Sequence, residues 1–259
     1  MSKKKETAVV VSQTKLSEGI YSMWIKTDIA KETKPGQFIS VYTRDKSKLL
    51  PRPISICEIT DDSLRIVYRI AGDGTREFAE YNAGEDIVIL GPLGNGFPVD
   101  IDEASAGKKA LLIGGGIGIP PMVQLGKSIA AEVSYAVGYR KDKDMFLEEE
   151  LNAAGTVYIA TDDGSKGTHG TVIDAIRNNN IEADVIYACG PKPMLKAVKA
   201  YAQEKGIKAY ISMEERMACG VGACLGCVCK STEKDDHSKV NNKRICKDGP
   251  VFLASEVEL

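Results

Sequence analysis

The chain has 259 residues, and its 34 Lys and Arg residues nearly balance its 36 Asp and Glu residues, which gives a formal net charge of −2. This length suits two compact domains with an appendage, and the balanced charge provides no basic field for a nucleic acid. No apolar run approaches the roughly 20 residues that cross a bilayer, so we expect no membrane partner. Seven cysteines without a secretory segment lead us to expect a cytoplasmic, reducing compartment.

Residues 1–102 contain short β-type runs separated by Gly, Pro and Asp turns, and we expect them to form the first domain. The expected strands are Ala8–Val11, Ile20–Thr27, Gln37–Thr43, Pro53–Ile59, Leu64–Ile70 and Asp86–Leu90. One helix-like insert is expected over Thr75–Tyr81. Six short strands with one helix predict a closed antiparallel β-barrel, and a β-sandwich of no special function is the alternative.

Several residues of this domain together have the composition of a phosphate site. In chain order they are Arg52, Pro53, Ile54, Ser55, Val67, Tyr68, Arg69, Gly74 and Thr75. An Arg side chain can place two N–H bonds on a pyrophosphate, and the N-terminus of a helix attracts anions. Each feature alone is weak, because an Arg-Pro dipeptide usually marks only the edge of a strand. Their order along the chain is more informative.

With Pro35-Gly36-Gln37-Phe38 before them, these motifs resemble the FAD domain of the ferredoxin–NAD(P) reductase superfamily. The resemblance implies that Arg52 and the helix start at Gly74-Thr75 hold the FAD phosphates. It also implies that Ser55 lies near the flavin N5. Many members carry Tyr at the position of Ile54, so in this chain another group has to stack on the flavin.

Residues 103–212 alternate apolar runs with helical stretches, which marks a second domain. The expected strands are Ala110–Ile113, Val133–Gly138, Thr156–Ala160, Asp184–Ala188 and Ile207–Ser212, and the expected helices are Pro121–Ala131, Asp144–Ala154, Val172–Asn178 and Pro193–Glu204. This alternation predicts an α/β domain with a five-stranded parallel sheet and helices on both faces.

A glycine run follows the first strand of this domain, at the carboxyl end where open α/β sheets bind ligands. Gly114, Gly115, Gly116 and Gly118 let the backbone approach a pyrophosphate at the start of a helix. The third glycine of the dinucleotide fingerprint is absent, so a plain strand-to-helix turn is the alternative. The run resembles the NAD(P) loop of the same superfamily.

Two further candidates lie at the ends of later strands. Cys189-Gly190-Pro191 resembles the superfamily's Cys-Gly-Pro motif, which implies that Cys189 lies near the nicotinamide and the flavin N5. Cys189 and Ser55 are therefore the catalytic candidates, although a lone buried Cys is usually structural. A carboxylate at Asp162 would repel a 2′-phosphate and accept from a ribose hydroxyl, which favours NAD over NADP. Ordinary turn chemistry is the alternative for Asp162.

Residues 213–259 are expected to form a small third domain around four cysteines. Cys219, Cys224 and Cys227 have the C-x4-C-x2-C spacing of plant-type 2Fe–2S centres, and Cys246 is the distant fourth ligand. Glycines between the ligands let backbone N–H groups approach the cluster sulfurs.

Three alternatives concern the use of these cysteines. A zinc site usually has two C-x2-C pairs, and disulfides are uncommon in cytosolic proteins, so both are weaker interpretations. Cys229 could replace Cys227 as third ligand, but the spacing would then be x4 twice. We expect Cys229 to be a bystander.

The placement of the cysteine segment after the NAD domain narrows the resemblance. Glu215–Cys224, Cys246–Phe252 and Gly91–Phe97 resemble the family of electron-transfer subunits of NAD-dependent bacterial dihydroorotate dehydrogenase. Membership implies FAD, a 2Fe–2S cluster and NAD as cofactors, and an FMN-containing catalytic partner subunit in a heterotetramer. It implies that electrons pass from that partner through the cluster and FAD to NAD⁺ in pyrimidine (UMP) biosynthesis.

The order of this relay also has a chemical reason. Nicotinamide exchanges two electrons as hydride, a cluster exchanges one, and a flavin can do both, so the flavin belongs between them. Two other functions stay open from the residues alone. One is a related reductase module that serves another acceptor, such as ferredoxin or sulfide. The other is a zinc-binding interaction module.

Overall fold

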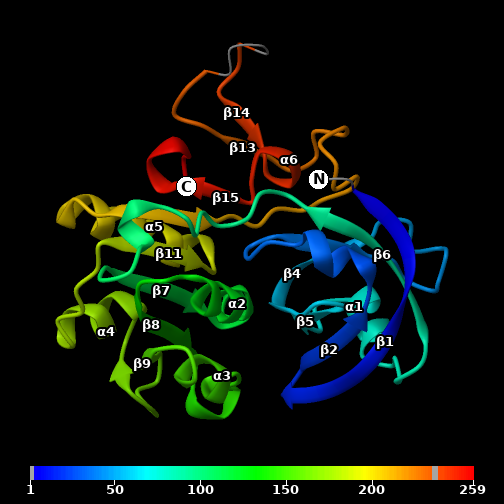
Figure 1. Ribbon diagram of the computed structural model, residues 1–259, viewed down its shortest axis with the longest axis horizontal. Helices are drawn as coiled ribbons and strands as arrows, with labels where there is room; N and C mark the ends of the chain where they lie inside the picture. The colour runs from blue at the N-terminus through cyan, green and yellow to red at the C-terminus, as the bar shows by residue number, and fades with distance from the viewer. Residues whose placement is uncertain (1–2, 235–238) are drawn as a thin grey trace.

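The computed structural model describes residues 3–234 and 239–259, so part of the polar insert between Cys227 and Cys246 lies outside the described residues. Figure 1 shows a β-barrel beside a sheet flanked by helices, with the cysteine segment resting above both. This arrangement confirms the predicted fold class. Among the described residues, no helix has the length and apolar content needed to cross a membrane.

The first body is a closed barrel in which all neighbouring strands are antiparallel, in the order β1-β2-β5-β4-β3-β6. The strands are β1 (Lys4–Ser17), β2 (Ile20–Lys26), β3 (Phe38–Val41), β4 (Arg52–Ile59), β5 (Ser63–Arg69) and β6 (Asp86–Leu93), with helix α1 (Asp73–Phe78) and the 3-10 turn η1 (Asp28–Glu32) between them. The barrel prediction is confirmed, and the sandwich alternative is wrong.

The first strand is much longer than the predicted run Ala8–Val11. Residues Lys4–Val9 pair with β6, and residues Val9–Ser17 pair with β2, so one strand serves two neighbours in succession. The two ends of β1 consist mostly of polar residues, so the pattern of apolar residues did not predict them as strand. Inside the barrel, alternate residues of every strand form one core, which contains Ile25, Ile39 and Ile87.

The second body is a seven-stranded sheet in the order β10-β9-β8-β7-β11-β12-β15. Its five central strands are parallel, as predicted, and they are β7 (Lys109–Gly115), β8 (Glu132–Tyr139), β9 (Thr156–Thr161), β11 (Val185–Cys189) and β12 (Lys208–Ser212). Two strands that we did not predict extend the edges: β10 (Thr168–His169), which is parallel, and β15 (Val251–Leu253), which is antiparallel. The helices are α2 (Pro120–Ser128), α3 (Glu148–Asn152), α4 (Val172–Asn178) and α5 (Lys192–Lys205).

The helices predicted to end at Tyr81 and Ala131 end at Phe78 and Ser128, and the largest difference concerns α3. Residues Asp144–Ala154 were expected to be helical, but α3 begins only at Glu148, after a separate 3-10 turn η4 (Asp142–Asp144). Leu147 has a left-handed backbone with φ of 65°, which no helix interior accepts. The three glutamates in the first turn of α3 favour a helix start there, because the N-terminus of a helix carries partial positive charge.

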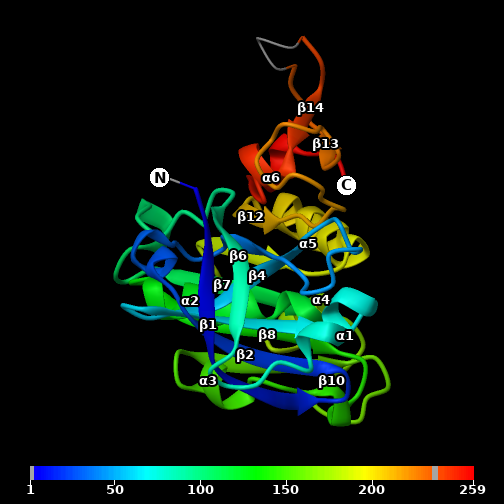
Figure 2. The same ribbon diagram turned by 90° about the vertical axis from the view of Figure 1, so that its right-hand side faces the viewer.

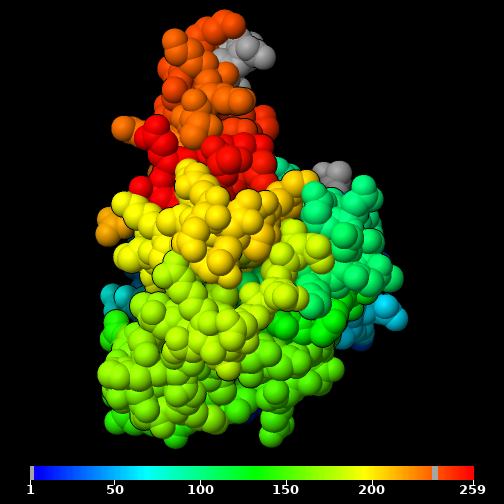
Figure 3. Space-filling model, turned by 90° about the vertical axis from the view of Figure 1, so that its left-hand side faces the viewer, coloured from blue at the N-terminus to red at the C-terminus, as the bar shows by residue number. Residues whose placement is uncertain are grey.

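The remaining residues form the cysteine segment and short turns. The segment contains the hairpin β13 (Val228–Lys230) and β14 (Asn242–Arg244), helix α6 (Ile245–Asp248) and the turn η5 (Ala254–Glu256), and the other 3-10 turns are η2 (Asp102–Ala104) and η3 (Gly116–Gly118). Figure 2 shows the hairpin rising above the rest of the molecule. Figure 3 shows the same projection from the side of α5, with the C-terminal residues between the helix and the hairpin.

Candidate redox site

The barrel opens between β4 and β5 at one end. Their pairing covers Ile56–Ile59 against Leu64–Ile66, and among the described strands Arg52–Ser55 pair only with β3. Arg52–Ser55 are half-buried, whereas the next three residues of β4 are buried. The two groups that resemble FAD motifs, Arg52–Ser55 and Val67–Arg69, therefore flank a gap in the barrel wall.

Arg52 and the start of α1 meet at this opening. A Cβ added to Gly74 would lie 2.1 Å from Arg52 Nε, so only glycine leaves room for the guanidinium against the helix. The Thr75 hydroxyl accepts hydrogen bonds from the N–H groups of Ala71 and Gly72 at 2.8 and 3.2 Å. The hydroxyl thereby fixes the chain where it enters the helix. The structure brings Arg52, Gly74 and Thr75 together, and this arrangement fits a phosphate.

The other barrel candidates divide by side-chain direction. Tyr68 is only 1% exposed, stacks on Tyr21 and donates its hydroxyl to Gln13 at 2.8 Å, so its ring belongs to the core and only its backbone can face a cofactor. Arg69 is exposed and Val67 is buried. Val67 packs in the same apolar cluster as Ile119, the residue after Gly118. The barrel candidates and the glycine run therefore adjoin one another.

The glycine run and the Cys-Gly-Pro segment lie side by side. Strands β7 and β11 are neighbours, and Gly114 pairs with Cys189. A Cβ on Gly118 would lie 2.3 Å from the Cys189 carbonyl oxygen, and one on Gly115 would lie 3.1 Å from Pro191 Cδ. Each close approach requires glycine, so the run is more than a plain turn. It forms a narrow backbone surface at the carboxyl ends of two parallel strands, where such sheets bind ligands.

Cys189 is half-buried at the end of β11. Burial raises the pKa of its thiol to about 12, although a hydrogen bond with the Ser212 side chain lowers it somewhat. Ser212 is 7% exposed and pairs with Cys189 across the neighbouring strand β12. The thiol is therefore neutral at physiological pH. Ser212 was not predicted, because a serine at the end of a strand has no distinguishing pattern.

Asp162 and Asp163 follow β9 at the same edge of the sheet but differ in role. Asp163 accepts hydrogen bonds from the Ser165 N–H and hydroxyl at 3.0 and 2.6 Å, which is turn chemistry. The Asp162 side chain is exposed, while its N–H donates to the Tyr139 carbonyl at 3.1 Å. This bond holds Asp162 beside the end of β8 with its carboxylate toward solvent.

The four cysteine candidates gather in the segment above the barrel, and backbone N–H groups point at their sulfurs. The N–H groups of Val221 and Ala223 donate to Cys219 Sγ at 3.4 and 3.3 Å. The N–H of Gly222 donates to Cys246 Sγ at 3.1 Å. Burial raises the pKa of Cys219, but the N–H donors outweigh it and lower this pKa to about 6. A loop that stabilises negative sulfur suits thiolate ligands.

The four cysteines form two pairs that are joined by backbone hydrogen bonds. The Cys224 N–H donates to Cys219 Sγ at 3.4 Å, and the Cys246 N–H donates to Cys227 Sγ at 3.4 Å. Among the described residues, no three His, Cys, Asp or Glu side chains are placed to hold a single metal ion. A 2Fe–2S cluster needs two thiolates on each of two irons, so two pairs with converging N–H donors fit this group.

The cysteine segment is anchored to the barrel through β6 and the turn after it. Asn95 N–H donates to the Gly249 carbonyl at 2.6 Å, and the Asn95 side chain donates to the Asp248 carbonyl at 3.0 Å. Next to this contact, Gly220 lies against Ser40 of β3. Asn95 belongs to the motif Gly91–Phe97 that the sequence already singled out. Ser40 carried no signal.

Comparison with known proteins identifies the family. The family model for the iron-sulfur cluster binding domain of dihydroorotate dehydrogenase B matches residues 214–258, and that for the oxidoreductase NAD-binding domain matches residues 112–200. A dihydroorotate dehydrogenase B (NAD(+)) electron transfer subunit of Listeria monocytogenes serotype 4b is 49% identical over 255 residues, which cover 96% of this chain and 97% of the relative. The chain belongs to this family of electron transfer subunits.

Other members and related structures agree with this assignment. The electron transfer subunit of Bacillus velezensis is 43% identical over 99% of this chain and its own full length. The solved structure of an NADH-dependent reduced ferredoxin–NADP oxidoreductase matches with a TM-score of 0.85 and 26% identity over 97% of this chain and 89% of the other. A ferredoxin–NADP⁺ reductase of Neisseria gonorrhoeae, with a TM-score of 0.65 and 17% identity, covers 83% of this chain and 95% of its own and shares the fold.

Family and fold together support FAD, a 2Fe–2S cluster and NAD as the cofactors of this electron transfer subunit, and the chain is an oxidoreductase. Membership also implies a separate catalytic subunit. These findings do not favour the zinc-binding interaction module.

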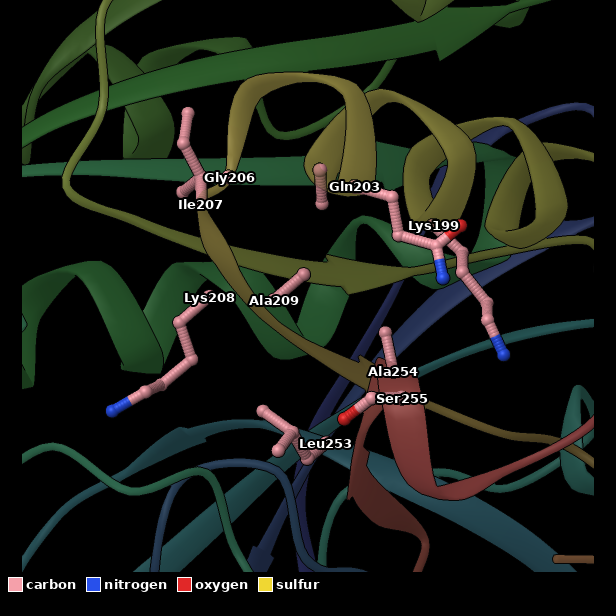
Figure 4. Close-up of a pocket in the computed structure, with 10 residues that line it drawn as sticks. Lys199, Gln203, Gly206, Ile207, Lys208, Ala209, Leu253, Ala254 and Ser255 are labelled. Atoms are coloured by element: carbon pink, nitrogen blue, oxygen red, sulfur yellow. The ribbon is translucent and has the colours of Figure 1, made fainter. Parts of the chain in front are cut away.

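A separate groove of about 200 Å³ lies between α5, β12 and the end of β15. In Figure 4 the ammonium groups of Lys199 and Lys208 extend to opposite sides of it. Lys199 donates to the Val257 carbonyl at 2.7 Å, and Lys208 is paired with Glu103. Both cations are thus already engaged, and the groove lies apart from the redox candidates of this electron transfer subunit.

Proposed function

We propose that this chain takes electrons from an FMN-containing dihydroorotate dehydrogenase subunit, through a 2Fe–2S cluster and FAD, to NAD⁺ in pyrimidine biosynthesis. The observation that best supports the order of the relay is the contact of Gly220 with Ser40. Gly220 lies in the loop between Cys219 and Cys227, here called the cysteine loop. Ser40 is the strand partner of Pro53 in the FAD motif. Bound FAD would exchange hydride with nicotinamide and single electrons with the cluster.

The barrel opening would bind FAD. We assign phosphate binding to Arg52, whose guanidinium is held over Gly74, and to the backbone at Thr75. We assign the remaining contacts to the residues that line the gap, namely Pro53, Ile54, Ser55, Val67, Tyr68 and Arg69. Tyr68 would contribute its backbone, because its ring is buried.

The carboxyl edge of the sheet would bind NAD. We assign its diphosphate to Gly114, Gly115, Gly116 and Gly118, and its ribose to the exposed Asp162. Gly190 and Pro191 close this surface on one side. Cys189 would hold the nicotinamide opposite Ser55 as a neutral thiol.

We assign the cluster ligands to Cys219, Cys224, Cys227 and Cys246. Val221 and Leu225 are large apolar residues with exposures of 36% and 62%, and they flank the exposed Cys224. We therefore propose that the catalytic subunit docks over this loop. We also propose that the assembly is a heterotetramer in the cytoplasm, as the family resemblance implies. Exposed apolar side chains around a redox ligand favour a partner contact of this kind.

We propose domain boundaries at 1–102, 103–212 and 213–259, which the change from barrel to sheet and the cysteine family match at 214–258 support. One short strand crosses the last boundary, because β15 of the third domain pairs with β12 of the second.

The test is an anaerobic assay of dihydroorotate-dependent NAD⁺ reduction with this chain and the FMN subunit, together and each alone. Activity only with both subunits supports the relay. The similarity to the NADH-dependent reduced ferredoxin–NADP oxidoreductase favours a second candidate, a reductase for another acceptor. If NADH reduces the FAD and the cluster but the pair does not oxidise dihydroorotate, this second function replaces the first.

A further inference from the structure

A polar network lies between the barrel and the NAD domain, and its ion pairs and hydrogen bonds involve none of the candidates described above. Its centre is Glu58 near the end of β4, whose residue exposure is 9%. Arg65 of β5, at 8% exposure, places Nη1 2.5 Å from Glu58 Oε2. Buried charges of this kind are stable only when they are paired and hydrogen-bonded.

Helix α2 of the NAD domain supplies two further contacts to the end of β4. Lys127 Nζ pairs with the second carboxylate oxygen of Glu58. One turn earlier, Gln124 Oε1 accepts a hydrogen bond from the Ile59 N–H at 2.8 Å. The end of β4 is therefore joined to the last turns of α2 by a charge pair and by a backbone hydrogen bond.

The network also reaches α3. Arg65 Nη1 lies 2.8 Å from Glu150 Oε1, and Arg65 Nε donates to Ser22 Oγ at 2.8 Å. Two cations and two carboxylates thus neutralise one another across the interface. Because each buried group has partners from both domains, a rotation of one domain against the other would separate opposite charges in a poorly hydrated place.

The elements that this network joins are those that begin at the two cofactor motifs. Strand β4 starts at Arg52, in the FAD motif, and ends at Ile59. Helix α2 follows the glycine run and ends at Ser128. Two separate contacts, one through Gln124 and one through Lys127, fix the direction of the helix against the strand as well as its position, so they limit how far the near ends can move apart.

We propose that Glu58, Arg65 and Lys127 are positioning residues that hold the NAD domain against the FAD barrel, so that nicotinamide and flavin meet at hydride-transfer distance. This inference deepens the proposed function, since it assumes that FAD and NAD occupy the motifs assigned above. The ion pairs and hydrogen bonds of these side chains lie outside both cofactor motifs, and the residues act through β4 and α2. A misplacement of about 1 Å between reacting atoms can cost roughly a hundredfold in rate, so such a clamp has a large effect on chemistry.

The test uses Lys127→Ala in the full chain with its cofactors. The Lys127 side chain is 40% exposed, so its loss leaves a smaller defect than the loss of Arg65. The matched control is Lys109→Ala, which removes a lysine whose exposed ion pair with Glu182 lies within the NAD domain.

The first readout is hydrogen–deuterium exchange at the Ile59 amide, which reports the bond to Gln124 without any need for activity. We expect Lys127→Ala to raise this exchange rate at least about fivefold, because the interface opens locally, and Lys109→Ala to leave it unchanged. Unchanged exchange at Ile59 in Lys127→Ala would overturn the clamp.

The second readout is stopped-flow reduction of the FAD by NADH and by NADH deuterated at the transferred position. We expect Lys127→Ala to slow reduction roughly tenfold at saturating NADH, with a larger isotope effect, an unchanged half-saturating NADH concentration and full FAD content. A merely structural role would lower FAD content or stability and leave the isotope effect as it is, and that result would overturn the positioning role. If NADH fails to reduce wild-type FAD, the proposed function is wrong, while the exchange rate at Ile59 still decides whether the clamp exists.

Discussion

Gly220 of the cysteine loop lies directly against Ser40 of the barrel. A Cβ built on Gly220 would be 3.1 Å from Ser40 Oγ and 3.2 Å from Leu93 Cδ1, and the φ of Gly220 is +67°. Ser40 is paired with Pro53 in the next strand. Cys219, the first of the proposed cluster ligands, therefore precedes a residue that lies one strand away from the proposed FAD motif.

Gly220→Ala should weaken this contact. The added methyl would push the loop away from β3 and would force a side chain into a left-handed backbone. We therefore expect electron transfer between the cluster and FAD to slow roughly tenfold. Freeze-quench EPR of the cluster after NADH addition measures this rate. The matched control is Gly206→Ala, because Gly206 has the same φ of +67° with open space around it. Equal rates in the two variants would show that the contact has no part in the transfer.

Gly74→Ala should reduce FAD affinity. Its methyl would lie 2.1 Å from Arg52 Nε, so the guanidinium has to leave the helix start. We expect FAD affinity to fall about tenfold, near 1.4 kcal/mol. Gly72→Ala is the control, since a Cβ on Gly72 meets nothing within 4 Å and its φ of 174° suits any residue. FAD binding is measured by flavin fluorescence. FAD affinity unchanged in Gly74→Ala would remove Arg52 from the phosphate site.

Cys224→Ser should remove the cluster but not flavin reduction. Loss of one thiolate breaks a ligand pair, whereas the NAD and FAD motifs lie elsewhere, so NADH-driven FAD reduction should stay within about twofold of wild type. Iron and acid-labile sulfide content measure the loss. Cys229→Ser is the control, because Cys229 lies in the adjacent hairpin and is a predicted bystander. Loss of the cluster in Cys229→Ser would make Cys229 a ligand, and a cluster kept in Cys224→Ser would remove Cys224 from the ligand set.

Asp162→Ala should relax the preference for NAD. Without the exposed carboxylate a 2′-phosphate meets no like charge, so we expect the NADPH-to-NADH ratio of kcat/KM to rise roughly tenfold. Asp163→Asn serves as control, since an amide oxygen can still accept from Ser165. Steady-state diaphorase rates with each nucleotide provide the measurement. If the NADPH-to-NADH ratio of kcat/KM stays unchanged in Asp162→Ala, Asp162 does not contact the ribose.

Cys189→Ala should change how stability depends on high pH. The pKa of this thiol is raised from 9.0 to about 12 in the folded protein, so between these values the folded state keeps a proton that the unfolded chain has lost. Stability is therefore lost as pH rises above 9, by up to about 1.4 kcal/mol per pH unit from this group. Apparent unfolding temperatures of wild type and variant should differ by a constant amount below pH 8 and converge toward pH 11. Parallel curves up to pH 11 would show that the thiol is not held in its neutral form.

The sequence predicted the elements whose signal is local. Alternating apolar residues marked most strands of the barrel, and the alternation of strands and helices marked the parallel sheet, whereas the pairing of Gly114 with Cys189 required the strand order that the structure shows. The ends of β1 were not predicted because polar residues occupy them. Strand β15 was missed because its partner β12 is far along the chain.

The sequence also could not predict residue roles that depend on neighbours in space. Ser40, Ser212 and Glu58 are ordinary strand residues, and each becomes informative only when the structure shows Gly220, Cys189 or Lys127 beside it. The Arg52 motif was recognisable, but the gap that makes it useful arises from the point where β4 and β5 stop pairing.

The return of the chain to the sheet at β15 has a consequence for how such proteins can be divided. The cluster-bearing residues leave the sheet after Ser212 and rejoin it at Val251, which pairs with that same Ser212. They are an insertion within one long hairpin rather than a tail added to a finished domain. A gene cut after Ser212 would therefore remove the edge strand of the sheet together with the cysteine-bearing residues.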